Sequence, residues 1–250
     1  MITNPNSERF SPLLLARILG FVGLAGIVTG AFDIGYVHNT LIVAANVPAT
    51  LHNIAAHENL FRAGFSTHLF EMLLNIVEEV LGYFLLRRVN GIVAALSLCA
   101  GVIGIAVESV GLLVAYVPLK LAISGSTLGG FSPQQVQAAS NFAIQLQETG
   151  LLLSFAFYGF DELLGGYLIF RSGFWPRVLG ILLALSGFCY LTNTFLSFLA
   201  PAFDARWSNY ILYACFPGEF LTSLWFATVG LNVEKWRDWT TVPERELVAA

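Results

Sequence analysis

Long apolar runs separated by short polar segments dominate the pattern of hydrophobic and polar positions along the chain. A helix needs about 20 mostly apolar residues to cross the hydrocarbon core of a bilayer. Six segments meet this requirement, and they are residues 13–36, 61–86, 91–117, 141–170, 178–199 and 210–233. A backbone that faces lipid must satisfy its own hydrogen bonds, so runs of this length predict helices rather than barrel strands. The pattern therefore predicts an all-α polytopic membrane protein, a bundle of six transmembrane helices.

The composition agrees with this prediction. Hydrophobic residues make up 56% of the chain and charged residues only 11%, whereas soluble domains carry about 25% charged residues. The net charge of -4 comes with no basic patch, so we expect no nucleic-acid partner. Cys99, Cys189 and Cys215 all lie in apolar runs, and we interpret them as small core residues rather than disulfides.

The distribution of Lys and Arg predicts the orientation, because cytoplasmic loops carry an excess of both. One side of the predicted bundle carries most of the basic residues, namely Arg9, Arg17, Arg87, Arg88, Arg171, Arg177, Lys235, Arg237 and Arg245. The other side carries Arg62, Lys120 and Arg206. Both termini are therefore predicted to be cytoplasmic, in a multi-pass protein of the bacterial cytoplasmic membrane.

The ends of the chain and its connections add detail to this picture. The first run is too long for a signal-peptide core and no small-residue cleavage site follows it convincingly, so we expect a permanent helix. We expect one transmembrane domain over 1–250, with a short cytoplasmic N-terminus at 1–12 and a tail at 238–250. Residues 51–60 suit a short amphipathic helix. Ser132, Pro133 and Gln135 form a capping box, which predicts that the fourth helix begins outside the membrane.

Parts of the chain resemble one another. Residues 78–83 are similar to residues 161–167, and residues 91–97 are similar to residues 180–186. A parallel repeat of helical hairpins would explain both similarities. Chance similarity between apolar helices is the alternative.

Ionisable residues inside the apolar runs are the main functional signal, because they are costly there and usually face the protein interior. The second helix carries a polar stripe, consisting of His68, Glu71, Asn75, Glu78 and Glu79. Depths counted from the predicted helix ends, at about 1.5 Å per residue, indicate two layers. The outer layer consists of His68, Glu71, Glu108, Glu148, Asn193 and Glu219. The inner, second acidic layer consists of Glu78, Glu79, Asp161 and Glu162.

Carboxyl groups crowded together in a medium of low dielectric cannot all be ionised. Protonated ones can serve as general acids or proton carriers, and ionised ones can bind a cation. We predict catalytic roles for the outer glutamates, Glu71, Glu108, Glu148 and Glu219. A second interpretation is a divalent metal ion, with His68, Glu71, Glu148 and Glu219 as its ligands. The alternative is that these acids only bridge helices by hydrogen bonds.

Two glycine-containing motifs have both a functional and a structural interpretation. Pro217 and Gly218 are predicted to interrupt the last helix beside Glu219. A broken helix at this depth marks substrate sites in transporters, and a simple kink is the alternative. Gly26 and Gly30 predict close packing of the first helix.

Several segments resemble a family of uncharacterised bacterial membrane proteins, the domain-of-unknown-function family 4386. They are residues 53–64, 85–90, 166–180, 217–219 and 224–225. The most specific part is Phe170-Arg171-Ser172-Gly173-Phe174-Trp175-Pro176-Arg177. The resemblance covers nearly the whole chain and implies a helical membrane fold with no established activity. Members of this family often have a His where this chain has Asp161, so a role tied to that His does not carry over.

Three functions fit these features. The first is an intramembrane enzyme that acts on a lipophilic substrate. The second is a proton- or cation-coupled carrier, in which Glu78, Glu79 and Glu162 complete the path. The third is a non-catalytic scaffold or partner subunit. The expected partners are membrane lipid and a lipophilic small molecule or cation, while the substrate and the oligomeric state do not follow from the sequence.

Overall fold

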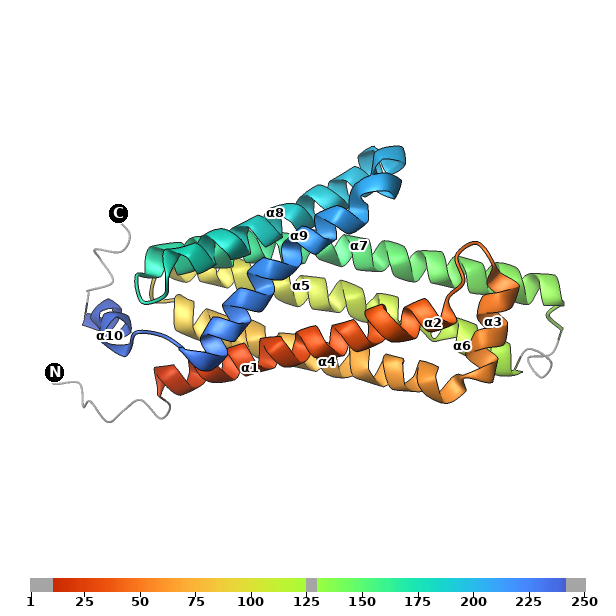
Figure 1. Ribbon diagram of the computed structural model, residues 1–250, viewed down its shortest axis with the longest axis horizontal. Helices are drawn as coiled ribbons and strands as arrows, with labels where there is room; N and C mark the ends of the chain where they lie inside the picture. The colour runs from red at the N-terminus through yellow and green to blue at the C-terminus, as the bar shows by residue number, and fades with distance from the viewer. Residues whose placement is uncertain (1–10, 125–129, 242–250) are drawn as a thin grey trace. The chain divides into compact units, whose positions relative to one another are not determined.

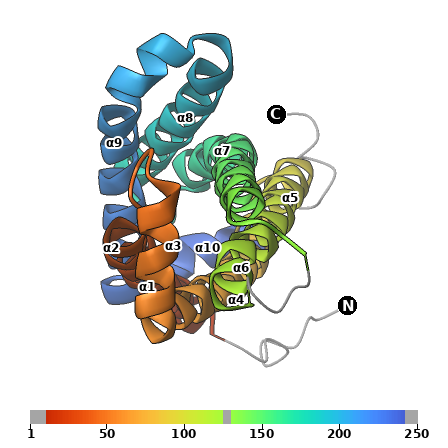
Figure 2. The same ribbon diagram turned by 90° about the vertical axis from the view of Figure 1, so that its right-hand side faces the viewer.

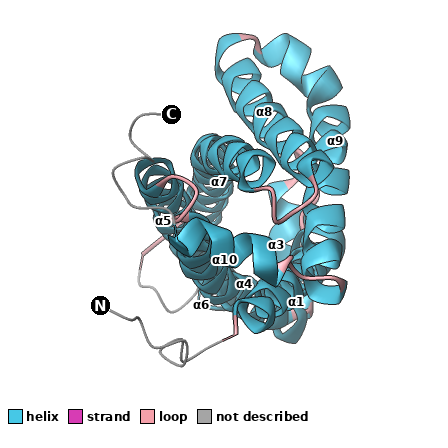
Figure 3. Cartoon of the chain, turned by 90° about the vertical axis from the view of Figure 1, so that its left-hand side faces the viewer, coloured by secondary structure: helices cyan, strands magenta, loops and turns pink. Residues whose placement is uncertain are grey.

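The computed structural model describes residues 11–124 and 130–241, and these residues form helices joined by loops, with no strand among them (Figures 1 and 3). The predicted all-α fold is therefore confirmed. The elements are α1 (Pro12–Gly30), η1 (Ala31–His38), α2 (Asn39–Leu41), α3 (Val47–Ala56), α4 (Glu58–Leu86), α5 (Gly91–Ala115), α6 (Val117–Ser124), α7 (Pro133–Ser172), α8 (Arg177–Leu199), α9 (Pro201–Thr228) and α10 (Val233–Thr241). The element η1 is a π-helix.

Four helical segments of the described residues are long and apolar enough to cross a membrane, and they are Pro12–Leu41, Gly91–Ile123, Pro133–Ser172 and Arg177–Leu199. Large apolar side chains point outward from them, among them Ile92, Leu113 and Leu199, which are 76%, 71% and 80% exposed. Such a surface suits lipid rather than water. The helices α4 and α9 are not among the four, and α4 carries the polar stripe of His68 and glutamates.

The described residues group into two compact units. Unit 1 consists of residues 11–24, 75–102 and 156–241, and unit 2 consists of residues 25–74, 103–124 and 130–155. Each unit is considered by itself below. The single transmembrane domain expected over 1–250 stays a prediction.

In unit 1, α8 and α9 lie side by side along much of their length (Figures 1 and 2). Gly218 of α9 lies directly against α8, because a Cβ atom placed there would be 2.5 Å from the Leu182 carbonyl oxygen. The Ser186 hydroxyl donates to the Cys215 carbonyl oxygen over 2.7 Å. The helix α9 continues through Pro217. The predicted interruption is therefore wrong, and Gly218 serves the close approach of two helices.

The helix α10 is attached to unit 1 by tryptophan side chains. The Trp236 indole donates to the Leu85 carbonyl oxygen over 3.2 Å, at the end of α4. The Trp239 indole donates to the Ser172 carbonyl oxygen over 2.7 Å, at the end of α7. Both bonds satisfy carbonyl groups that a helix C-terminus leaves without an intrahelical donor. The guanidinium of Arg88 covers the Trp236 ring at 4.1 Å.

Unit 2 confirms one predicted helix start and changes the bounds of another predicted helix. The Ser132 N–H donates to Gln135 Oε1 over 2.8 Å, and the Gln135 N–H donates to Ser132 Oγ over 3.3 Å. This reciprocal capping box begins α7, as predicted. The short helix expected at 51–60 is α3, which begins four residues earlier, where Asn46 accepts from the Ala49 N–H. Figure 2 shows α3 beside α6.

The cysteines, Cys99, Cys189 and Cys215, are free thiols.

Candidate acid–base site

A histidine held between two carboxylates is the centre of unit 2. Nδ1 of His68 on α4 lies 2.7 Å from Asp33 Oδ2 on η1, and Nε2 lies 3.1 Å from Glu108 Oε1 on α5. The side chains of His68, Asp33 and Glu108 are 6%, 19% and 13% exposed. Three segments that are far apart in the sequence thus bring together one base and two acids.

The backbone around Asp33 explains how this residue reaches α4. Asp33 lies in a π-helix, and π-helical turns are frequent at functional sites. Opposite it on α4 is Gly64, where a Cβ atom would be 2.6 Å from Asp33 Oδ1 and 2.8 Å from Val37 Cγ1. Because glycine lacks that atom, η1 approaches α4 closely enough for Asp33 to meet the imidazole one helical turn further on.

The number of protons in the two hydrogen bonds gives the charge of the cluster formed by Asp33, His68 and Glu108. Each of the two hydrogen bonds needs one proton, so two protons lie on the three groups. Counted over these two hydrogen bonds alone, the two carboxylates and the imidazole ring carry a net charge of −1, wherever along the two bonds the protons lie. The arrangement can therefore accept a proton at one carboxylate and release one at the other without a change in total charge.

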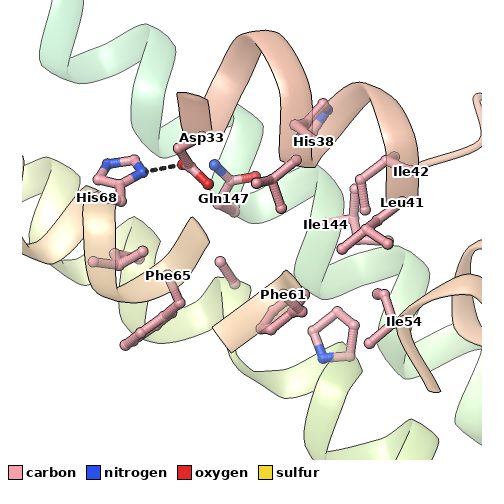
Figure 4. A pocket seen from close by; sticks show the side chains of 14 residues that line it. Asp33, His38, Leu41, Ile42, Ile54, Phe61, Phe65, His68, Ile144 and Gln147 are labelled. Atoms are coloured by element: carbon pink, nitrogen blue, oxygen red, sulfur yellow. Dashed lines mark hydrogen bonds and ion pairs between the residues drawn. The ribbon is translucent and has the colours of Figure 1, made fainter. Parts of the chain in front are cut away.

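An apolar cavity of about 70 Å³ adjoins His68 and Asp33. One ordered water needs only roughly 10–15 Å³, so the cavity has room for a larger group. Figure 4 shows Asp33 and His68 at one end of it and Leu41 and Ile54 toward the other. The other lining residues are Val37, His38, Ile42, Phe61, Phe65, Leu112, Ala115, Pro118, Ile144 and Gln147. Apolar walls with a few convergent polar groups are typical of a small-molecule site.

The structure brings some members of the predicted outer layer together and separates others. Glu108 contacts His68, and Glu71 lies in the same unit against Gly30, where a Cβ atom would be 3.0 Å from Glu71 Oε1. Glu148 is exposed on α7. Glu219 and Asn193 belong to unit 1. Of the four predicted catalytic glutamates, Glu108 is the one that the structure shows in contact with His68.

The predicted metal ligands are His68, Glu71 and Glu148 of unit 2 and Glu219 of unit 1. Within residues 11–124 and 130–241, no three His, Cys, Asp or Glu side chains form a group that could hold a metal ion. Both nitrogens of His68 face carboxylates, so neither is turned toward a further ligand. The site as built suits proton transfer rather than coordination.

The predicted second acidic layer falls in unit 1, and its members lie close together. Glu79 and Asp161 lie near enough to interact electrostatically, and the Ser97 hydroxyl donates to Asp161. Glu78 lies against Gly23, where a Cβ atom would be 2.5 Å from Glu78 Oε1. Unit 1 therefore holds a second cluster of acids.

Glu162 and Glu219 form the rest of this group in unit 1. They lie near enough to interact electrostatically, and Tyr190 is hydrogen-bonded to Glu219. Among the described residues, Glu162 Oε2 and Glu219 Oε1 are shielded from solvent and have no hydrogen-bond partner. Glu219, which was predicted for the outer layer, thus interacts with Glu162 of the predicted second layer.

Sequence reasoning did not identify Asp33, Ser97 or Tyr190 as site residues. Asp33 is the only charged residue between Arg17 and Glu58. An isolated acid in a long apolar run was the available signal. It was missed because Asp33 does not belong to a polar stripe. Ser97 and Tyr190 carry no charge, and their role depends on which helix they face.

The fold and this site define a helical membrane protein that holds a histidine–carboxylate cluster beside an apolar cavity. The chain belongs to the family described as domain of unknown function DUF4386, whose sequence profile matches residues 18–230. The resemblance found in the sequence is thereby confirmed. No curated protein and no solved structure matches the chain.

Proposed function

We propose that the protein carries out acid–base chemistry on a lipophilic small molecule, with Asp33, His68 and Glu108 as the proton-transferring groups. The observation that carries this proposal is the position of His68, which is bonded at both nitrogens and lies at the polar end of an apolar cavity. Of the four glutamates predicted as catalytic, Glu108 keeps that role, and Glu71 is a nearby acid one helical turn from His68.

The roles follow from the geometry. His68 passes a proton between Asp33 and Glu108, because it can take a proton at one nitrogen and give one up at the other. Asp33, which lines the cavity, exchanges that proton with the ligand. Asp33 and Glu108 orient the ring and stabilise its charged form. The apolar walls exclude water, which strengthens each of these interactions.

We further propose six membrane crossings, with both termini in the cytoplasm of a bacterial cell and membrane lipid around the helices. The helices α4 and α9 have 29 and 28 residues, which is about 40 Å at the rise of an α-helix. The polar faces of these helices would then be turned toward protein rather than lipid. The excess of Lys and Arg near the ends of α4, α7, α8 and α10 supports this orientation, and it places His68 in the outer half of α4.

Untargeted mass spectrometry of a reaction mixture tests the proposed activity. Purified protein in lipid nanodiscs is incubated with a bacterial lipid extract, and changes in its components are followed with time. We expect His68→Asn to lower the rate roughly 100-fold or more, the usual contribution of a general acid–base. Ala115→Trp fills the cavity and should have the same effect. His52→Asn, at an exposed position on α3, is the matched control and should leave the rate unchanged.

Equal turnover in His68→Asn and the wild-type protein would contradict the proposal. It would leave the cluster with a structural role, as in the scaffold hypothesis.

A proton-coupled carrier is the second candidate, and the acids of unit 1 favour it because Glu79 and Asp161 lie near enough to interact electrostatically. Proteoliposomes that contain the wild-type protein should then acidify in a substrate gradient, and Glu79→Gln should abolish the effect. Vesicles that move no protons under any gradient would exclude this candidate.

A further inference from the structure

The charges around the cavity of unit 2 favour one class of ligand. Asp33 and His68 line its polar end, and together with Glu108, which does not line the cavity, they carry a net charge of −1, as counted above. Among the described residues that line the cavity, none is a lysine or an arginine. An anionic group would therefore meet a like charge in an apolar surrounding, whereas a cationic group would find its counter-charge there.

Two aromatic rings add to this preference. Phe61 and Phe65 line the cavity on the same face of α4 as His68. Their positions are fixed by Tyr116, whose ring centroid lies 6.3 Å from that of Phe61 and 5.0 Å from that of Phe65. Aromatic faces attract cations and are used to bind ammonium groups. They also provide apolar surface for a hydrocarbon chain.

From these observations we infer that the ligand is a lipophilic cation, an amine or ammonium head on an apolar body. This inference rests on the proposed function and specifies its substrate class. The head lies beside Asp33 and His68, with Glu108 behind His68, and the apolar body extends between Phe61, Ile144 and Ile54. A primary amine could in addition pass a proton to one of the carboxylates, giving a neutral amine and a carboxylic acid.

Photo-crosslinking with three matched probes tests the inference. The probes share one long alkyl chain with a diazirine and differ only in the head, which is a primary amine, an alcohol or a carboxylic acid. The protein is held in nanodiscs of zwitterionic phosphatidylcholine, so that the lipid surface itself prefers no charge. Labelled peptides are then identified by mass spectrometry.

We expect the amine to label the peptides that contain Phe61, Phe65 and Ile144 about tenfold more than the alcohol does, and the carboxylic acid to label them least. Such a factor corresponds to about 1.4 kcal/mol. Asp33→Asn combined with Glu108→Gln should remove the preference of the amine over the alcohol. Glu148→Gln removes a charge from an exposed position in the same unit and should leave the preference intact.

The other outcomes separate the inference from the proposed function. Equal labelling of the cavity by the amine and the alcohol would overturn the inference and leave the proposed function standing. Labelling of the cavity by none of the probes would contradict both. A preference that survives the double carboxylate substitution would show that these two groups do not select the ligand.

Discussion

At the residue scale, the surroundings of His68 give the most information about the chemistry of the site. A single carboxylate beside an imidazole fixes a tautomer, but two carboxylates on opposite nitrogens connect three groups into one path for a proton. The same arrangement makes each group depend on the others, because the loss of one leaves a polar atom without its partner in an apolar surrounding.

The first prediction measures this dependence by a double-mutant cycle. Asp33→Asn and His68→Asn should each lower the free energy of unfolding by about 1–3 kcal/mol, because each removes one partner of a shielded hydrogen bond. The double variant should lose less than the sum, with a coupling energy of about 1–2 kcal/mol. Thermal and denaturant unfolding in mild detergent provides the values. Strict additivity would show that the two side chains do not interact.

At the element scale, the contact between η1 and α4 depends on a glycine. Gly64→Ala places a methyl group within 3 Å of Asp33 and Val37. We expect it to destabilise the protein by about 1–3 kcal/mol and to lower activity, because Asp33 is displaced from His68. Gly35→Ala is the matched control on η1, where a Cβ atom would meet nothing within 4 Å. It should be neutral or slightly stabilising. Similar behaviour of the two variants would contradict the close contact.

The proline in α9 allows a second prediction at this scale. A proline inside a helix leaves the carbonyl group four residues earlier without its N–H donor. Since α9 continues through Pro217, which is exposed, Pro217→Ala restores a hydrogen bond and is expected to maintain or raise the melting temperature. A loss of stability above about 1 kcal/mol would mean that the proline sets a bend on which the packing depends.

The sequence predicted the helices well and the members of the site less well. Apolar periodicity and the Ser132 capping box depend on local chemistry, so the existence of each long helix could be predicted. The start of the last helix could not, because the polar and aromatic residues after Pro201 suggested a loop. The helix α9 begins at Pro201 rather than at 210, which puts Glu219 roughly 14 Å further from its start.

It was harder to predict which side chains of different helices contact one another. His68 and Glu108 were identified because each interrupts an apolar run. Asp33 is the partner of His68 because of the way η1 approaches α4. No pattern within a single helix predicts such an approach. The pairing of Glu79 with Asp161 likewise depends on packing within unit 1. Helical periodicity indicates which side chains share a face, but not which face lies opposite.

At the scale of the whole molecule, each of the two compact units holds its own group of acids. His68 with Asp33 and Glu108 belongs to unit 2, while Glu79 and Asp161 belong to unit 1. We therefore expect substitutions in the two groups to have different effects. Changes at Asp33 or Glu108 should affect turnover of the lipophilic substrate, whereas changes at Glu79 should affect any proton movement.

Reporter fusions test the proposed topology. With six crossings, a fluorescent protein fused after Asn90 or Gly173 should be cytoplasmic and bright. The same reporter fused after His57 or Ala200 should be dark, while alkaline phosphatase at those two positions should be active. Because α4 connects His57 to Asn90, equal behaviour of fusions at these two positions would show that α4 does not cross the membrane.

The central claim, that His68 is held between Asp33 and Glu108, is tested most directly by nitrogen-15 NMR of histidine-labelled protein in bilayers. The chain has four histidines, and the His68→Asn spectrum identifies the His68 signals by subtraction. We predict that Asp33→Asn shifts the Nδ1 signal most, that Glu108→Gln shifts the Nε2 signal most, and that Glu148→Gln shifts neither. If His68 responds to none of these substitutions, the cluster does not exist as described, and the acid–base site falls with it.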